Sequence, residues 1–450
     1  MADFREDSVQ PLTEILADNI VGSANVEPTA AQLAAARRIL IDWLGVALAG
    51  SQEPVARIMR DEFAKPSGEA TILGSLLRAS PADAALVNGA SGHALDYDDV
   101  QEFVGHPGAV VVPAALAVAE VENVDGLRLL RAIITGFDAA RYVGTLAMPG
   151  HYDRGFHSTA TICTFGAAAA ACHLMRLGEQ QTAYAIGLAA TQAAGLKAMF
   201  GTMAKPFHAG RAASAGVTAA RLAARGMEAN SRALETGQGF LDTQAHQAVP
   251  AGWMPPAYGE SLHHLLFKFH ASCYLTHSSI EALRQLKIEH GVRSENVSRV
   301  VLRVPAGHLK VCNIEEPRTG LETKFSLRHI AAMVLSGYDT AELSVFSDKV
   351  ANEPTLRELR RRVEVRGDLD AHFETKVEIA LAAGMPLSMA ADVSKASFPD
   401  EELDRRLDKK FRTLVGPIMG DQATEHLLTV SYTLAKDGLG DLLDAIRGPA

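Results

Sequence analysis

The chain has 450 residues, 48% of them hydrophobic, so it is long enough for two or three domains with sizeable cores. Its 43 Lys and Arg residues stand against 53 Asp and Glu residues, a formal net charge of -10. This acidic balance argues against a nucleic-acid-binding or anionic-membrane surface, because binding to phosphates needs a basic face. A local basic pocket is compatible with it.

The four cysteines are scattered among apolar or small residues: Cys163, Cys172, Cys273 and Cys312. They show neither a CxxC pair nor metal-ligand spacing, so we expect buried, reduced thiols. The N-terminus carries acidic residues where a secretory signal is basic. No stretch reaches the roughly eighteen apolar residues that a membrane span needs. We therefore expect a cytoplasmic protein that does not contact a membrane.

Residues 11–250 show one helical pattern after another. Thr29 and Gln32 have the spacing of a capping box before apolar residues at helical intervals. Ser80 and Pro81 open another helix as N-cap and first-turn proline. Much Ala and Gly with only 6% aromatic residues indicates closely packed helices that are buried nearly all round.

The pattern changes after about residue 265. The sequence then predicts a helix, a β-rich run, a helix, a helix running into a strand, and two strands around Ala383-Gly384, in residues 279–291, 297–305, 324–337, 354–368 and 376–393. The helical pattern returns after residue 397, so the last fifty or so residues are expected to rejoin the first domain.

The predicted fold is therefore mainly α, with a small α+β domain inserted into a large all-helical domain. We place the all-helical domain at residues 1–265 and 395–450 and the α+β domain at residues 266–394. A cleft between two such units is the default place for a site.

Five short segments bring ionisable side chains together with glycine and small residues. They contain His93, Asp96, Asp98, Asp99, His106, His151, Tyr152, His157, Lys205, His208, Arg211, His270 and His277. Such groups are costly to bury singly, so we expect them to line one wet cavity. Structural alternatives stay open: a core or surface role for any one histidine, capping or loop bracing for Asp98 and Asp99, and an ion pair for Arg211.

The patterns of common metal and cofactor sites do not occur around the "DYDD" of residues 96–99. Neither a calcium loop with its obligatory glycine nor an HExxH zinc motif is found. The chain also lacks glycine-rich phosphate loops and the GxSxG elbow of serine hydrolases. We expect no metal and no cofactor, and interpret the site as one for proton chemistry by Asp, His, Lys and Tyr.

At these segments the sequence resembles the MmgE/PrpD family, which includes 2-methylcitrate dehydratase, cis-aconitate decarboxylase and iminodisuccinate epimerase. The resemblance rests on several motifs in one order: "VNGASGHALDYDD", "GHPGAVVVPA", "GFHSTATICTFGAAAAA", "GTMAKPFHAGRAASAGV", "KFHASCYLTH", "KFSL" and "LDKKFRTL". It implies a large all-helical domain, a smaller α+β lid and a homodimer.

By motif, the family's active-site positions correspond to Asp96, His106, His157, Lys205 and His277. Tyr152, in "GHY" ahead of "GFH", corresponds to a proposed acid/base tyrosine of the epimerase. Candidate substrate-binding residues are Arg211, His208, His270 and His329.

The sequence departs from the family's pattern at three places. Val100 stands where decarboxylase-like members have Thr, Arg328-His329 where they have a Tyr, and His270 where a Tyr is usual. These departures indicate that the pocket differs from that of the decarboxylases.

The resemblance implies a cofactor-independent lyase that acts on a small di- or tricarboxylic acid. Our first hypothesis is a hydro-lyase like 2-methylcitrate dehydratase, which removes a proton next to a carboxylate. An epimerase of a dicarboxylate and a decarboxylase of the cis-aconitate type are alternatives, and a non-catalytic binding protein is a further one. In each reaction charge accumulates on a carboxylate-stabilised carbon, which Lys205 can offset while His106 and His157 move protons.

Overall fold

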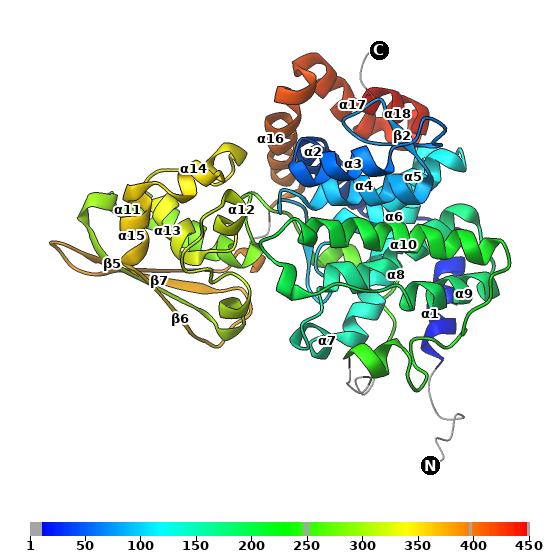
Figure 1. The fold of residues 1–450 in the computed structure, drawn as a ribbon, viewed down its shortest axis with the longest axis horizontal. Helices are drawn as coiled ribbons and strands as arrows, with labels where there is room; N and C mark the ends of the chain where they lie inside the picture. Colours follow the sequence, from blue (N-terminus) through cyan, green and yellow to red (C-terminus); the bar gives the residue numbers. More distant parts are fainter. Residues whose placement is uncertain (1–10, 246–248, 250–252, 396–397, 448–450) are drawn as a thin grey trace.

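The structure is a computed structural model that describes residues 11–245, 249, 253–395 and 398–447. Figure 1 shows a larger part built from helices of both ends of the chain, and beside it a smaller part that contains the sheet. The predicted mainly α class is confirmed. The domain boundaries and the action of the smaller part as a lid stay predictions.

Most of the larger part is made of helices. They are α1 (Leu12–Gly22), α2 (Ala30–Gly50), α3 (Pro54–Phe63), α4 (Pro81–His93), α5 (Gly108–Val121), α6 (Gly126–Ala147), α7 (Gly150–Asp153), α8 (Ser158–Met175), α9 (Glu179–Ala190), α10 (Ala204–Ala224), α16 (Asp400–Met419), α17 (Asp421–Asp437) and α18 (Leu439–Arg447). The predicted capping box of Thr29 and Gln32 starts α2, and Ser80 caps α4 as predicted. After the sheet the chain returns, and α16 packs on α2.

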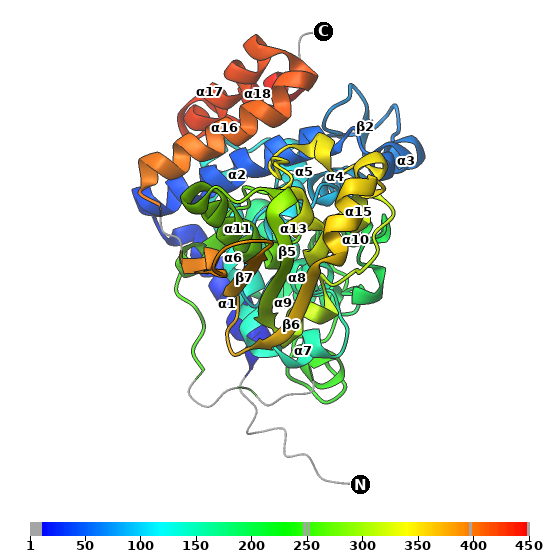
Figure 2. The same cartoon turned by 90° about the vertical axis from the view of Figure 1, so that its left-hand side faces the viewer.

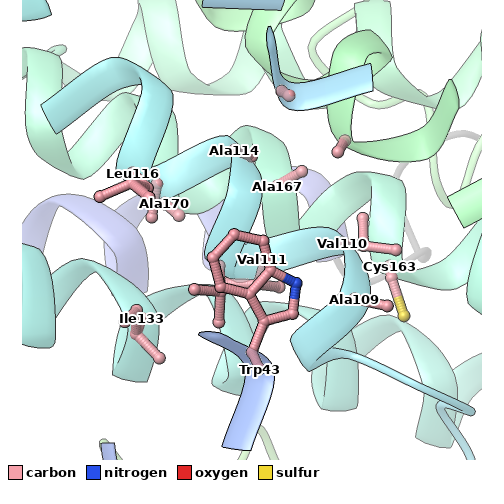
Figure 3. Close-up of a cluster of buried hydrophobic side chains, with 14 of the residues drawn as sticks. Trp43, Ala109, Val110, Val111, Ala114, Leu116, Ile133, Cys163, Ala167 and Ala170 are labelled. Carbon is pink, nitrogen blue, oxygen red and sulfur yellow. The ribbon is translucent and has the colours of Figure 1, made fainter. Parts of the chain in front are cut away.

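The core of the larger part is made mostly of small and branched side chains. Figure 3 shows the ring of Trp43 among residues such as Val111 and Ala167, from α5 and α8. All four cysteines are free and buried, as predicted. Close packing of this kind needs side chains of little volume, which agrees with the many Ala and Gly residues.

Two glycines let helices α4 and α10 cross at backbone contact. A Cβ atom on Gly89 would lie 2.9 Å from the Cα atom of Gly210, and one on Gly210 would overlap the carbonyl oxygen of Leu86. The close crossing positions the site, because Asp96 follows the end of α4 and Lys205 lies in the first turn of α10.

Helix α8 differs from the expectation that no segment is long and apolar enough to span a membrane. Its 18 residues have a mean hydropathy of 1.2, so by length and composition it is able to cross a membrane. However, 94% of this stretch is buried inside the fold. That burial is typical of the central helix of a packed core.

The smaller part carries a four-stranded sheet in the order β6-β5-β7-β8, where β5 is parallel to β6 and antiparallel to β7. Its elements are α11 (His277–His290), β5 (Val297–Pro305), α12 (Gly320–Thr323), α13 (Leu327–Leu335), α14 (Asp348–Ala351), α15 (Pro354–Arg361), β6 (Val363–Leu369), β7 (Thr375–Leu381) and β8 (Leu387–Ala391). Helix α11 packs on β7 and β8, and α13 on β6 (Figure 2). The predicted helices and strands of this region are confirmed.

Four further strands have two residues each: β1 (Ala70–Thr71), β2 (Arg78–Ala79), β3 (Val100–Gln101) and β4 (Leu265–Leu266). Strand β3 directly follows the acidic turn of residues 96–99 and pairs with β4 in antiparallel fashion. Since β4 comes just before Lys268, this pairing places that lysine next to the turn.

Candidate active site

A cavity of about 130 Å³ lies where the larger and smaller parts meet; we call it the candidate active cavity. Five of the residues that the sequence singled out line it: Asp96, His106, Tyr152, His157 and Lys205. The smaller part contributes mainly apolar and thiol-bearing walls, from Cys273, Leu275, Val311, Phe325 and Phe373. The expectation of one shared cavity is met for these five residues.

Asp96 is the charged centre of the cavity. It sits just past α4 with a φ of 51°, in the left-handed region that Asp tolerates better than most residues. Its Oδ1 atom accepts hydrogen bonds from Lys205 Nζ at 2.7 Å and Lys268 Nζ at 2.9 Å. Burial raises the pKa of Asp96, but the two ammonium groups outweigh burial and hold the pKa well below its ordinary value. Asp96 is therefore an ionised carboxylate.

Three further buried lysines surround the same turn and were not singled out from the sequence. Lys268 donates to the carbonyl oxygen of Asp96 at 2.9 Å, Lys410 to that of Tyr97 at 2.7 Å, and Lys324 to that of Leu95. Burial lowers the pKa of Lys324 to about 8. Each lysine belongs to a motif that carried the family resemblance, "KFH", "KFSL" or "DKKF", and that was the available signal.

Asp98 is the shared partner of two histidines. Its Oδ2 atom lies 2.8 Å from His93 Nδ1 and 3.3 Å from His106 Nδ1. Burial is the largest influence on both rings, and it lowers the pKa of His93 to about 4 and also lowers that of His106. Both rings are thus neutral donors at neutral pH. Asp98 orients the histidines as well as bracing the loop, a role that the sequence did not indicate.

His106 is held with one ring nitrogen directed at the cavity. Its Nδ1 atom donates to the carbonyl oxygen of Asp99 at 2.8 Å, and since a carbonyl only accepts, Nδ1 carries the proton. Its Nε2 atom is then a free base, 4.0 Å from Asp96 Oδ1. The Asp99 carboxylate accepts the backbone N–H of Gly108 at 3.0 Å, the bracing role that was considered for it.

His157 and Tyr152 differ in protonation state: the first is a neutral ring and the second a protonated hydroxyl. Burial, followed by the charge of Lys205, lowers the pKa of His157 well below its ordinary value, so its ring is neutral. Its Nδ1 atom lies 3.2 Å from Nδ1 of His208, the neighbouring candidate residue. Burial raises the pKa of Tyr152, which therefore keeps its proton. His157 is suited to accept a proton and Tyr152 to donate one.

His270 and His277 do not line the candidate active cavity. They line a neighbouring cavity of about 430 Å³, and Tyr274 borders both cavities. His270 Nε2 lies 2.8 Å from Glu281 Oε1, and its Nδ1 atom lies 2.8 Å from Thr340 Oγ1. The ring of His277 lines this neighbouring cavity together with Tyr274, and its assignment as an active-site residue stays a prediction.

Arg211 and His329 are also not brought to the cavity. Arg211 follows Lys205 by six residues, about one and two-thirds turns of α10, so its side chain points elsewhere and is exposed. His329 is completely buried in α13, with Nδ1 3.5 Å from Nη1 of Arg360. Burial lowers the pKa of His329 to about 4. Among the residues that the structure describes, neither contributes to the lining.

Four groups near the turn have ligand atoms within 4.8 Å of one another, close enough to hold a metal ion: His93, Asp96, Asp98 and His106. Two imidazoles and two carboxylates suit a transition metal in donor type. The fit is poor in charge, because the ammonium groups of Lys205 and Lys268 already neutralise Asp96. The expected lack of a metal stays a prediction, which metal analysis of the purified protein tests.

Comparison with known protein families assigns nearly the whole chain. The MmgE/PrpD N-terminal domain matches residues 14–251, and the MmgE/PrpD C-terminal domain matches residues 270–434. This chain belongs to the MmgE/PrpD family. The resemblance seen in the motifs is thereby confirmed.

The chain is similar to several cis-aconitate decarboxylases. The human enzyme is 25% identical over 467 aligned positions, which cover 98% of this chain and 96% of the human protein. The Aspergillus terreus enzyme is 25% identical over 435 positions, covering 89% of this chain and 87% of the relative. A cis-aconitate decarboxylase-like protein of Aspergillus oryzae is 32% identical over 275 positions, 56% of each chain.

Proposed function

We propose that this MmgE/PrpD family protein is a cofactor-independent lyase of a small di- or tricarboxylic acid. One observation carries the proposal: the ionised Asp96–Lys205 pair shares a small cavity with neutral His106 and His157 and with protonated Tyr152. Such a set provides a fixed cation, a proton acceptor and a proton donor. It is what cleavage of a bond next to a carboxylate needs.

Lys205 provides the charge that holds the substrate. Lys205, Lys268 and Lys324 outnumber the single carboxylate of Asp96 that they surround, so a positive potential remains for a substrate carboxylate. As electron density builds up on the carbon next to that carboxylate, the ammonium group of Lys205 stabilises it. Asp96 keeps Lys205 in place at 2.7 Å. When carbon dioxide leaves, the bond from that carbon to the departing carboxylate breaks and Tyr152 gives the carbon a proton. When water leaves, His157 takes the proton from that carbon and Tyr152 gives a proton to the departing hydroxide.

Loss of carbon dioxide is the first reaction that we propose, because the relatives that match almost the whole chain are cis-aconitate decarboxylases. Loss of water, the first hypothesis from the motifs, comes second. Val100 lines the cavity, so its replacement of the decarboxylases' Thr lies where the substrate binds. His329 lies in the interior of the smaller part, so its departure from the pattern acts at most indirectly.

Epimerisation is a second candidate function, favoured by Tyr152. This residue and His157 both line the cavity, and an epimerase needs two groups that exchange one proton on one carbon. The predicted homodimer and cytoplasmic location remain part of the proposal.

The deciding experiment offers the purified protein a set of polycarboxylic acids in deuterated water, with products followed by mass spectrometry. The set contains cis-aconitate, citrate, 2-methylcitrate, malate and aspartate-derived diacids. Loss of carbon dioxide, loss of water, and deuterium uptake without either separate the three reactions. Lys205→Ala serves as the inactive control. A folded protein that changes none of these acids would contradict the proposal and favour a binding protein.

A further inference from the structure

A larger cavity lies at the opposite end of helix α8 from the candidate active cavity. Its volume is about 480 Å³, and we call it the arginine pocket. The N-terminus of α8 brings Ser158 and Thr159 to the active cavity, whereas its C-terminus brings Cys172 and His173 to this second one. Eighteen helical residues rise about 27 Å, so the two cavities are separate sites.

The arginine pocket combines cations with an apolar wall. Arg128 and Arg131 come from the start of α6, and Arg176 follows the last residue of α8. The apolar wall is formed by Ile20, Val21, Leu127 and Leu177. Asp125 is the only acid that lines the cavity within the described part of the chain, and it already accepts the backbone N–H of Arg128 at 2.8 Å as the cap of α6.

The three arginines line the cavity together with His173, and their charges act on its ring. Burial and, after it, the charges of Arg128, Arg131 and Arg176 lower the pKa of His173 to about 4. The neutral ring is fixed by Nδ1, which lies 3.0 Å from Ser23 Oγ. Burial also lowers the pKa of Arg128, followed by the like charge of Arg176.

Arg131 leaves part of its hydrogen-bonding capacity unused. Its Nη2 atom pairs with Glu27, whose side chain is 77% exposed, and exposed ion pairs of this kind are weak. Its Nε atom is buried, and among the described residues it has no hydrogen-bond partner. A buried guanidinium donor without a partner is costly, and an anionic ligand would satisfy it.

We propose that the arginine pocket binds an organic phosphate. A phosphate group carries close to two negative charges and three strong acceptor oxygens, which the three guanidinium groups of this cavity match. The apolar wall is suited to the organic body of the ligand, and the volume lies in the usual range for small-molecule sites. The cavity of about 130 Å³ at the other end of α8 is much smaller, so the two sites select ligands of different size.

Isothermal titration calorimetry with ADP, inorganic phosphate and succinate tests this proposal. The variants are the double variant Arg131→Gln/Arg176→Gln, the control Arg225→Gln at an exposed position after α10, and Lys205→Ala in the active cavity. We expect ADP to bind more tightly than phosphate or succinate. The double variant should weaken ADP binding by about tenfold or more, as expected for lost charge-assisted bonds, while Arg225→Gln and Lys205→Ala should not.

Four outcomes would overturn the proposal. They are no ADP binding at millimolar concentration, unchanged affinity in the double variant, succinate or inorganic phosphate binding as tightly as ADP, and loss of ADP binding in Lys205→Ala. The last outcome would place the ligand in the active cavity. Circular dichroism of each unliganded variant shows whether it is folded, and Arg176→Gln alone, at an exposed residue, replaces the double variant if that does not fold.

Discussion

The two sites at the ends of helix α8 differ in how completely their charged side chains are paired. At its N-terminus, Asp96 is neutralised by Lys205 and Lys268, and Asp98 is bonded to His93 and His106. At its C-terminus, three arginines share one cavity with a single lining acid that already caps a helix. The difference suggests different uses. A paired network holds side chains in fixed positions for chemistry, whereas cations with few acidic partners leave binding capacity for a ligand.

Catalysis in the candidate active cavity should depend most on Lys205. Lys205→Ala removes the cation of the cavity and leaves Asp96 with Lys268 alone, so turnover of the identified substrate should fall by about a hundredfold or more. Steady-state kinetics measure the loss. Lys436→Ala, at an exposed position of α17, is the matched control and should keep normal turnover. Near-normal turnover of Lys205→Ala would show that the pair is structural only.

Asp98 gives the second largest expected effect. Asp98→Asn keeps a hydrogen-bond acceptor but removes the charge that raises the pKa of His93 and His106, so we expect turnover to fall by about tenfold. Without that charge the pKa of both histidines falls further. The acid limb of the pH–rate profile should therefore move to lower pH. A loss of activity with an unchanged profile would assign Asp98 a purely structural role.

The close crossing of α4 and α10, which positions Asp96 and Lys205 in the candidate active cavity, is also testable. Gly210→Ala places a Cβ atom against the carbonyl oxygen of Leu86, and we expect a loss of about 1–3 kcal/mol in the free energy of unfolding, as for other overpacked cores. Urea denaturation measures it. The control Gly440→Ala has no neighbouring atom within 4 Å of the added Cβ, so stability should be unchanged or slightly higher. Equal stability of both variants would contradict the close crossing.

The sequence was sufficient to predict most of the longer helices and strands and five of the residues that line the candidate active cavity. Helix starts such as Thr29 and strands such as Val297–Pro305 depend on local patterns, which the chain carries in full. The meeting of Asp96 with Lys205 was predictable from the cost of burying either charge alone. The catalytic roles of these residues stay predictions.

Other features depend on how deeply a residue is buried in the fold, which a local sequence pattern does not encode. Lys268 is completely buried, whereas most lysines are exposed to solvent. Its residue type therefore did not predict its place in the site. His277 follows the same motif but lines the neighbouring cavity. The arginine pocket joins three segments with no shared motif, Ile20–Asn25, Asp125–Arg131 and Cys172–Leu177, and only the packing of their helices reveals it.

The smallest expected effect concerns the arginine pocket: it is the contribution of His173 to the stability of the folded protein as the pH falls. Its pKa in the folded protein, about 4, lies below its ordinary value of 6.5. The unfolded chain therefore takes up the proton first, and the contribution of His173 to stability is present above pH 6.5 and lost as the pH falls toward 4. Arg176→Gln removes one charge that lowers this pKa. Less stability should then be lost in that window, by about a few tenths of a kcal/mol, because Arg176 is exposed.

Thermal melting of Arg176→Gln between pH 7 and pH 4, in a phosphate-free buffer of low ionic strength, measures this effect. The buffer matters because a bound anion would screen the same charge, and added salt should make the variant and the natural protein converge. Arg225→Gln controls for the change in net charge. If Arg176→Gln lost more stability than the natural protein as the pH fell, the positive charge of the arginines would not lower the pKa of His173 as inferred.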